Sequence, residues 1–242
     1  MRSVIIIVRY RKRFIPFALL SMALFRLPLW LNKKISFWKL LGCGQNGSFD
    51  KRPDWQQWGI LVVIKGESRI PESLNGKEIK TVFGSFIAKW IRIFKCETWQ
   101  VVLEPLAVHG LWDGKKVFGE LSTPNGQEGR IAILTRATIR FSRLRDFWNN
   151  VGTVSAQMAV AKGFVCSLGI GEIPLIKQAT FSIWESAEHM KKFAYGNDAH
   201  KEVIHKTRKE NWYSEEMFVR FRIISTKGTI KGVNPGVGVL AG

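Results

Sequence analysis

The chain has 242 residues, of which 46% are hydrophobic and 23% charged, so it can bury a sizeable core as one large domain or two small ones. A formal net charge of +18 favours partners that carry negative charge, either nucleic acid or the face of an anionic membrane. The basic residues are spread along the chain without zinc-finger spacing or an RNA-binding aromatic signature, so we expect no nucleic-acid partner. Three cysteines, none in a C-x-x-C pair, disfavour a disulfide framework and indicate a cytoplasmic location.

The first half of the chain begins with a predicted strand at residues 3–8 and an apolar segment at residues 14–31. The apolar segment has 18 residues, one charge at Arg26 and two prolines. It barely reaches the length of a membrane span, and an arginine near a bilayer centre costs roughly 2.5–3.5 kcal/mol. We expect a helix that packs on a sheet and has one face near lipid, which predicts peripheral contact with the inner membrane; a true span is the alternative.

Further elements complete this half and the next in the same order. Strands are predicted at residues 35–41, 55–64 and 97–106, with an apolar helical run at 82–94. In the second half, strands are predicted at 130–138, 164–169, 178–185 and 217–224. Ser142 and Ser186 are expected to cap its two helical stretches, the second interrupted near Gly196-Asn197. The order β-α-β-β-α-β is that of the ferredoxin-like unit.

One constant shift along the chain aligns the two halves over their first three elements. It superposes Val4 on Ile131, and Leu41-Gly42-x-Gly44 on Leu168-Gly169-x-Gly171. We therefore predict an α+β fold of tandem duplicated ferredoxin-like halves, residues 1–108 and 130–226, that form a dimeric α+β barrel-like pseudo-dimer. Residues 109–129 would connect the halves, and the Gly-rich tail at 227–242 would lie outside the core. The space between the two sheets would be a natural pocket.

One histidine stands out among the residues that could carry chemistry. The sequence has no Walker loop, no G-x-G-x-x-G after a strand, no G-x-S-x-G and no H-E-x-x-H. His109, His189 and His205 are expected to be solvated or structural. His200 follows Phe193 by seven residues and precedes Val203 by three, so helical spacing predicts that it faces the sheet and the pocket. A core histidine with a hydrogen-bond partner is one interpretation, and a haem ligand with an open iron position opposite is the other.

At these residues the chain resembles the spheroidene monooxygenase family, the acyclic-carotenoid ketolases. The likeness extends over most of residues 3–228 and is looser between residues 65 and 95. Four segments carry it: FWKLLGCGQNGSF at 37–49, ILTRATIR at 133–140, LGIGEIPLIKQATFSIWES at 168–186, and MKKFAYGNDAH at 190–200 onward through WYSEEMFVRFR at 212–222.

The resemblance implies a haem oxygenase that takes O2 and electrons from a donor such as a ferredoxin, and hydroxylates an acyclic carotenoid twice to give a ketone. It implies that His200 is the axial ligand of the haem iron. Arg136 would meet a haem propionate, with a salt bridge as the alternative, and Trp38 and Trp184 would line the substrate pocket, with plain core as the alternative. The competing function is a non-catalytic ferredoxin-like protein that binds haem or another lipophile.

Overall fold

The structure is a computed structural model of the whole chain, and it describes residues 1–45, 51–66, 76–119, 121, 129–196 and 198–236. Within these ranges the side chains of residues 76–78, 198–202 and 204 lie outside the description. Both halves have the predicted β-α-β-β-α-β order. The first half contains β1 Arg2–Arg9, η1 Lys12–Phe14, α1 Ile15–Leu24, α2 Arg26–Leu31, β2 Ile35–Gly44, β3 Pro53–Ile64, α3 Gly76–Phe83, α4 Ser85–Ile93 and β4 Glu97–Gly110. The second contains β5 Ile131–Ile139, η2 Phe141–Arg143, α5 Leu144–Ala159, β6 Phe164–Ile173, β7 Lys177–Trp184, α6 Ala187–Gly196, α7 Asp198–Lys209 and β8 Tyr213–Gly228.

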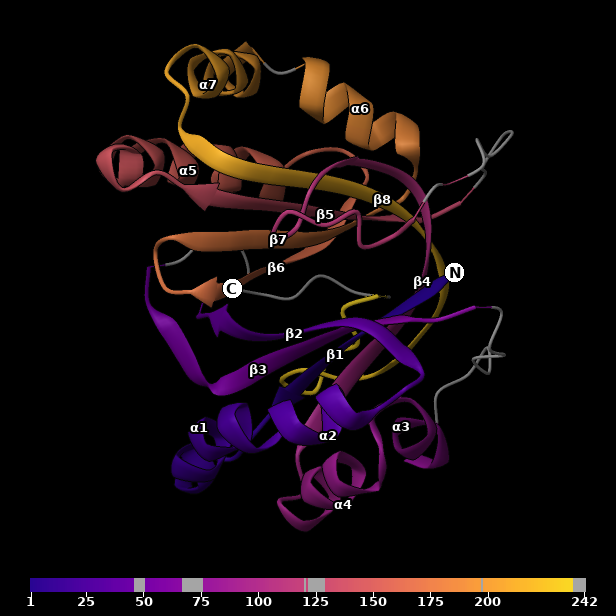
Figure 1. The fold of residues 1–242 in the computed structure, drawn as a ribbon. Coiled ribbons are helices and arrows are strands. Elements are labelled where there is room, and N and C mark those ends of the chain that lie inside the picture. The colour runs from indigo at the N-terminus through magenta and orange to yellow at the C-terminus, as the bar shows by residue number, and fades with distance from the viewer. Residues whose placement is uncertain (46–50, 67–75, 120, 122–128, 197, 237–242) are drawn as a thin grey trace.

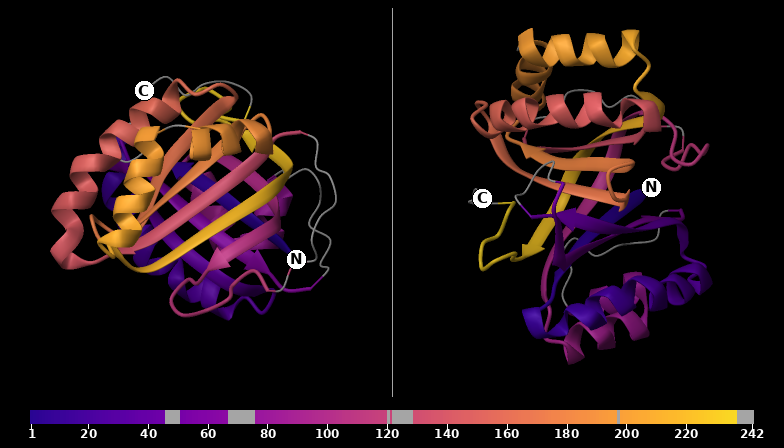
Figure 2. Two further views of the ribbon diagram at one scale, coloured as in Figure 1. Left: turned by 90° about the horizontal axis from the view of Figure 1, so that it is seen from above. Right: turned by 90° about the vertical axis from the view of Figure 1, so that its left-hand side faces the viewer.

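Eight strands close into one barrel in the spatial order β1-β3-β2-β6-β7-β5-β8-β4, and the neighbouring strands pair antiparallel. Within each half the fourth strand lies beside the first, and the second strand lies at the other edge. The halves join edge to edge through β4–β8 and β2–β6. Helices α1–α4 cover the outside of one sheet and α5–α7 the outside of the other, so the barrel lies between two helical layers (Figures 1 and 2). The predicted α+β barrel architecture is confirmed.

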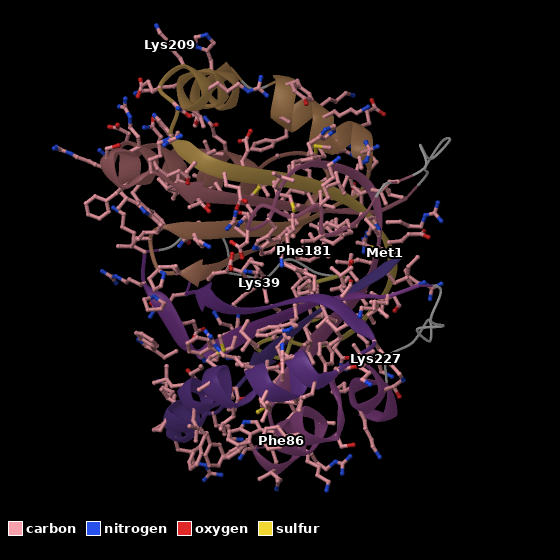
Figure 3. The ribbon with its side chains drawn as sticks, in the orientation of Figure 1. Met1, Lys39, Phe86, Phe181, Lys209 and Lys227 are labelled. Atoms are coloured by element: carbon pink, nitrogen blue, oxygen red, sulfur yellow. The ribbon has the colours of Figure 1, made fainter. Side chains whose placement is uncertain are left out.

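The strands alternate between the barrel interior and the helices because successive side chains point to opposite faces. In β1, Ile5 and Ile7 join the interior cluster, whereas Val4, Ile6 and Val8 pack under the helices of the first half. The interior is one continuous apolar cluster to which both halves contribute, with Phe181 near its centre (Figure 3). The expectation of an open chamber between the two sheets is wrong, because these side chains occupy the interior.

Two short turns add to this interior cluster, one after each fourth strand. Trp112, from the connection, and Ile230, from the tail, are buried in the barrel core. Each turn is closed by an isolated antiparallel β-bridge, between Trp112 and Lys115 in the first and between Ile230 and Val233 in the second. The tail prediction is therefore wrong for Ile230: part of the Gly-rich segment enters the core, because one apolar side chain is enough to anchor a turn.

The two turns are built alike. Glu215 accepts hydrogen bonds from the backbone N–H groups of Asp113 and Gly114, and Glu97 accepts them from Lys231 and Gly232. Gly110 and Gly228, which end β4 and β8, have φ of +84° and +90°, and a Cβ on either would lie about 2 Å from a carbonyl oxygen of the facing strand. Only glycine tolerates that approach. This likeness is a second point of correspondence between the halves.

The element boundaries correct the alignment between the halves. The first three pairs of elements begin at one constant separation: β1 at Arg2 and β5 at Ile131, α1 at Ile15 and α5 at Leu144, and β2 at Ile35 and β6 at Phe164. At that separation the counterpart of Val4 is Ile133. The predicted match of Val4 with Ile131 was therefore wrong by two residues. Because side chains two positions apart on a strand share a face, the predicted alignment still placed them on the correct side of the sheet.

Several predicted boundaries also differ from the structure. The apolar segment at 14–31 is divided at Phe25 into α1 and α2. Ser142 lies in the 3-10 turn that precedes α5 and makes no capping bond there, whereas the Ser186 hydroxyl accepts the His189 N–H and caps α6 as predicted. α6 ends at Gly196 and α7 begins at Asp198, and the predicted interruption at Asn197 lies outside the described residues. The strands that run into the barrel seams are longer than predicted, because pairing with the other half extends them.

Candidate functional site

The two sheets present different side chains to their helices. On the first sheet, Ile6, Ile60 and Leu40 lie side by side in one cross-strand row. The equivalent row of the second sheet is Thr135, Thr180 and Gly169, in the same pairing. All three large apolar side chains of the first half are thus replaced by smaller ones in the second.

The adjoining row repeats this difference. Trp38 and Val62 pair on the first sheet, and Ser167 and Ser182 pair at the corresponding positions of the second. We call Thr135, Ser167, Gly169, Thr180 and Ser182 the small-residue floor. Truncating buried side chains of this size costs about 2–5 kcal/mol each unless something fills the space. A floor of this kind is expected where another group packs on the sheet.

One of the five floor residues is exposed and the other four are buried, so the helices leave the floor open at that one position. Thr135 lies in the middle of β5, on the side that α5–α7 cover, yet it is exposed to solvent. Thr180, its neighbour, is 6% exposed, and its hydroxyl oxygen has no hydrogen-bond partner among the described residues. Buried hydroxyls nearly always have a partner. An unpartnered hydroxyl beside an open position is the pattern expected of a ligand-binding surface.

Helix α7, which contains His200, lies in the layer that covers this sheet (Figure 1). Val203 of α7 packs against the buried cluster that contains Ile139, Phe147 and Trp212, and Thr207 is 9% exposed. This face of α7 is therefore turned toward α5 and the sheet. The side chain of His200 lies outside the described residues. The helix is on the outer side of the sheet, so any pocket that His200 faces lies between α7 and the sheet, and its predicted orientation stays a prediction. The sheet itself separates α7 from the barrel interior.

Arg136 lies on the opposite side of the sheet from α7. Its side chain is 1% exposed and points into the barrel with those of Ala132 and Leu134. The guanidinium pairs with Glu215, and its Nη2 lies 3.4 Å from carboxylate oxygens of both Asp113 and Glu172. This is the salt-bridge alternative that the sequence left open.

The ion pairs around Arg136 extend across both halves. Lys39 of β2 pairs with Asp113 and Glu172, and lies where the two halves meet (Figure 3). Lys177 lies 2.8 Å from Asp113. The Trp112 indole donates to Glu172 at 2.8 Å, and the Arg136 guanidinium lies 5.5 Å from the centre of that ring. This charge network holds the Trp112 turn and closes one end of the barrel.

The network lowers the pKa of two of its carboxyl groups. Partial burial alone would raise the pKa of Asp113, but hydrogen bonds and charges from Lys177 and Lys39 outweigh it and lower the pKa to about 2. Partial burial likewise opposes ionisation of Glu215, and the Gly114 N–H, Arg136 and the Asp113 N–H together lower its pKa below the ordinary value. Both groups therefore stabilise the folded state in their charged form.

Trp38 and Trp184 both face the helices. Trp38 packs in the cluster under α1–α4, and Trp184 is 2% exposed and packs against Phe164 and Phe193. They do not occupy equivalent positions, because the counterpart of Trp38 is Ser167. Both locations match the core alternative.

Other polar groups have simpler roles. The His189 ring lies 3.0 Å from the Ser186 hydroxyl at the start of α6, and His205 is exposed. His109 lies in β4 and is exposed, so it belongs to a strand and not to the connection. Among the described residues no group of three or more His, Cys, Asp or Glu could hold a metal ion.

Sequence reasoning missed Arg220. It lies on the helix-facing side of β8, opposite Ile133, which heads the row of Ser182 and Ser167. It is half-buried and forms no ion pair within the described part of the chain, unlike Arg222, which lies 3.1 Å from Glu104. The alternation of Phe218, Arg220 and Arg222 along a predicted strand was the available signal.

The closed barrel and the order of its strands place the chain in the class of two-half ferredoxin-like α+β barrel proteins. Two solved structures of aldoxime dehydratase share this fold: one in complex with butyraldoxime has a TM-score of 0.63 at 10% identity, covering 99% of this chain and 85% of that one. The other has a TM-score of 0.58 at 8% identity, and the match covers 99% of this chain and 87% of that one. Identities this low show the fold alone.

The chain belongs to the spheroidene monooxygenase family. It is 32% identical to the Rhodobacter capsulatus spheroidene monooxygenase over 91% of this chain and 89% of that protein. It is 34% identical to the Rubrivivax gelatinosus protein of the same name, over 81% of this chain and 72% of that protein. The Cereibacter sphaeroides spheroidene monooxygenase is 36% identical over 84% of this chain, which spans 60% of that relative's length. No protein-family model matches the chain.

Replacing Arg136 by Met is expected to lower the free energy of unfolding by about 3 kcal/mol, because partly buried carboxylates lose their shared cation. Urea unfolding followed by tryptophan fluorescence measures the loss. Arg143→Met is the control: Arg143 pairs with Asp146 and Glu210 at an exposed site, and its loss should cost about 0.5 kcal/mol or less. Equal small losses in both variants would contradict a structural role for the charge network.

The lowered pKa values of Asp113 and Glu215 predict acid sensitivity. Unfolded carboxyl groups take up protons near pH 4, whereas these two hold their charge in the fold to lower pH. Their contribution is therefore complete above about pH 5 and is lost as the pH falls toward 2. In urea titrations over that range, Lys39→Met/Lys177→Met should lose less stability on acidification than the unmodified chain does. A parallel decline in both proteins would refute the assignment.

Proposed function

We propose that this chain is a haem-dependent monooxygenase that inserts oxygen into an acyclic carotenoid. O2 and an external electron donor such as a ferredoxin are the co-reactants, and the protein works in the cytoplasm at the membrane surface. The observation that carries the proposal is the likeness to three proteins named spheroidene monooxygenase, over 81–91% of the chain. The outer side of the second sheet supplies a binding surface of suitable chemistry.

The proposed reaction oxidises one methylene near the end of the polyene in two steps. In each step one atom of O2 enters a C–H bond as a hydroxyl, and two electrons and two protons from the donor and solvent reduce the other atom to water. Two hydroxyls on one carbon form a gem-diol, which loses water and leaves a ketone. Haem, when bound, supplies the activation of O2, and the protein supplies binding and orientation.

We place the haem on the small-residue floor, between the second sheet and α5–α7. Small side chains at Gly169 and Thr135 allow a flat ring close to the strands, and the unpartnered Thr180 hydroxyl can donate to a ligand. His200 is proposed as the residue that would hold the haem iron. It precedes Val203 and Thr207 by three and seven residues, the spacing of one helical face, and both of those residues pack inward.

The proposal assigns propionate binding to Arg220 in place of Arg136. The three carboxylates around Arg136 already satisfy its charge, and the sheet separates it from α7. Arg220 is half-buried on the same side as the floor and forms no carboxylate pair among the described residues. A guanidinium in that setting is suited to a haem propionate.

Filling the floor is expected to exclude the cofactor. Thr135→Leu/Gly169→Leu restores side chains of the size that the first half has at Ile6 and Leu40, so haem absorbance at the Soret band should fall at least about tenfold. The urea midpoint of the variant should stay near that of the unmodified chain. Gly152→Leu/Thr153→Leu makes the same two changes on the exposed side of α5 and should retain the Soret band. A full Soret band in the filled variant would place the haem elsewhere.

Expression in a host that makes acyclic carotenoids tests the function as a whole. Pigment analysis should show a hydroxylated product that has gained one oxygen atom, and then a ketone that has lost two hydrogens relative to it. The purified protein should have a Soret band that shifts when dithionite and carbon monoxide are added. His200→Ala should lose both the band and the products, whereas His205→Ala, an exposed histidine of the same helix, should keep both.

The outcomes separate the alternatives. An unchanged spectrum in His200→Ala rejects that residue as the ligand. Haem binding without oxygenated pigment, with O2 and reductant present, favours the competing function of a non-catalytic haem- or lipophile-binding protein.

A further inference from the structure

Large apolar side chains are exposed together on the helices of the first half. They lie on α1, α2 and α4 at the end of the molecule opposite α6 and α7, where Phe86 is labelled (Figures 1 and 3). The set, which we call the apolar face, consists of Phe17, Leu19, Leu20, Leu24, Leu27, Trp30, Leu31, Phe86 and Ile93. Trp30 and Ile93 are 72% and 71% exposed. Large exposed apolar side chains gathered at one end of a molecule mark a binding site.

The second half has no such surface on the helix that occupies the same place in the fold. Helix α5, the counterpart of α1, buries Phe147, Val151 and Met158 and exposes none of its large apolar side chains. Helix α1 packs through Ala18 and Ser21 and exposes Leu20 and Leu24 among others. The exposure is therefore a property of this half and not a requirement of the fold.

The charged residues of the two segments that carry the apolar face are all basic. Residues 11–34 and 85–95 contain nine Lys or Arg and no Asp or Glu. All nine are exposed, and none pairs with a carboxylate in the described ranges of the chain. They are Arg11, Lys12, Arg13, Arg26, Lys33, Lys34, Lys89, Arg92 and Lys95.

We propose that the apolar face, with its basic rim, docks the protein side-on against an anionic lipid bilayer. Leucine, phenylalanine and tryptophan side chains would enter the boundary between headgroups and acyl chains, and the basic residues would contact the lipid phosphates. The complementarity of charge selects this occupant, because a rim whose described charges are all positive repels a second copy of itself. This inference rests on the proposed function in that it deepens the membrane location proposed there, and its evidence is exposure and charge.

The structure opposes insertion of the same segment as a membrane span. Residues Lys12–Leu31 are long and apolar enough to cross a membrane by length and composition, with a mean hydropathy of 1.8. Yet α1 has 10 residues, about 15 Å of helix, and the chain is divided before α2, whereas a bilayer core is about 30 Å thick. Phe25 and Leu29 are buried, and the Asn32 amide donates to the Val82 carbonyl. Removing the segment would uncover the apolar residues of the first sheet beneath it.

Vesicle flotation of the full chain tests the docking. The protein should float with phosphatidylcholine vesicles containing one-third phosphatidylglycerol, and float weakly with phosphatidylcholine alone. Raising the salt from about 0.1 M to about 0.5 M should weaken binding. Leu27→Gln/Trp30→Gln/Ile93→Gln should lower the bound fraction at least about tenfold, because these side chains supply the apolar contact.

A matched control changes three equally exposed apolar residues of the second half. Phe141→Gln/Val160→Gln/Tyr195→Gln should bind vesicles as the unmodified chain does. Circular dichroism and the Soret band of both variants check folding and haem binding separately, so failure of docking is distinguishable from failure of the proposed function. Equal binding by both triple variants, or no binding to anionic vesicles, overturns the proposal.

Two further measurements exclude other occupants. Alkaline carbonate should release docked protein from the vesicles, and resistance to release would indicate a span instead. Sedimentation velocity without lipid should give the same species for the unmodified chain and the Leu27/Trp30/Ile93 variant. A dimer that this variant abolishes would show that a second copy covers the face.

Discussion

Closure of the barrel constrains everything else in this protein. Each ferredoxin-like half carries helices on one face of its sheet and must bury the other face, and pairing of β4 with β8 and of β2 with β6 turns both uncovered faces inward. The interior is then filled by apolar side chains and by Trp112 and Ile230 from the two turns. This interior has no room for the proposed haem, which we place instead on the outer side of the second sheet, where small residues line the strands.

The halves share a topology but divide their tasks. In the first, Ile6, Ile60 and Leu40 fill the space between sheet and helices, and the apolar face lies on the outside of α1, α2 and α4. In the second, Thr135, Thr180 and Gly169 occupy the equivalent positions under an ordinary helical layer. One half thus supplies the surface proposed for lipid, and the other supplies the surface proposed for haem. The charge network around Arg136 ties the two together at the barrel end.

Much of this architecture could be predicted from local patterns. The β-branched run of β1 and the Ser186 cap of α6 depend on neighbours within a few residues, and both were recognised. The site was harder. The predicted alignment of the halves followed the Gly-x-Gly pairs, and it matched Ile6 with Ile133 instead of Thr135, which concealed the loss of side-chain volume. Arg136 is far along the chain from its partners Asp113, Glu172 and Glu215, so no local pattern could show that its charge was already balanced.

The sequence by itself determined the order of elements, its repetition in the second half and the family, because hydrophobic periodicity and short motifs are local properties of the chain. Only the tertiary structure decided which face of each sheet became the interior, that Trp112 and Ile230 fill it, and that α7 lies outside it. Those outcomes depend on edge pairing between strands that are distant in the sequence, and on the space that side chains leave when two halves meet. Alternation along a strand tells two faces apart but does not say which of them will be covered by helices.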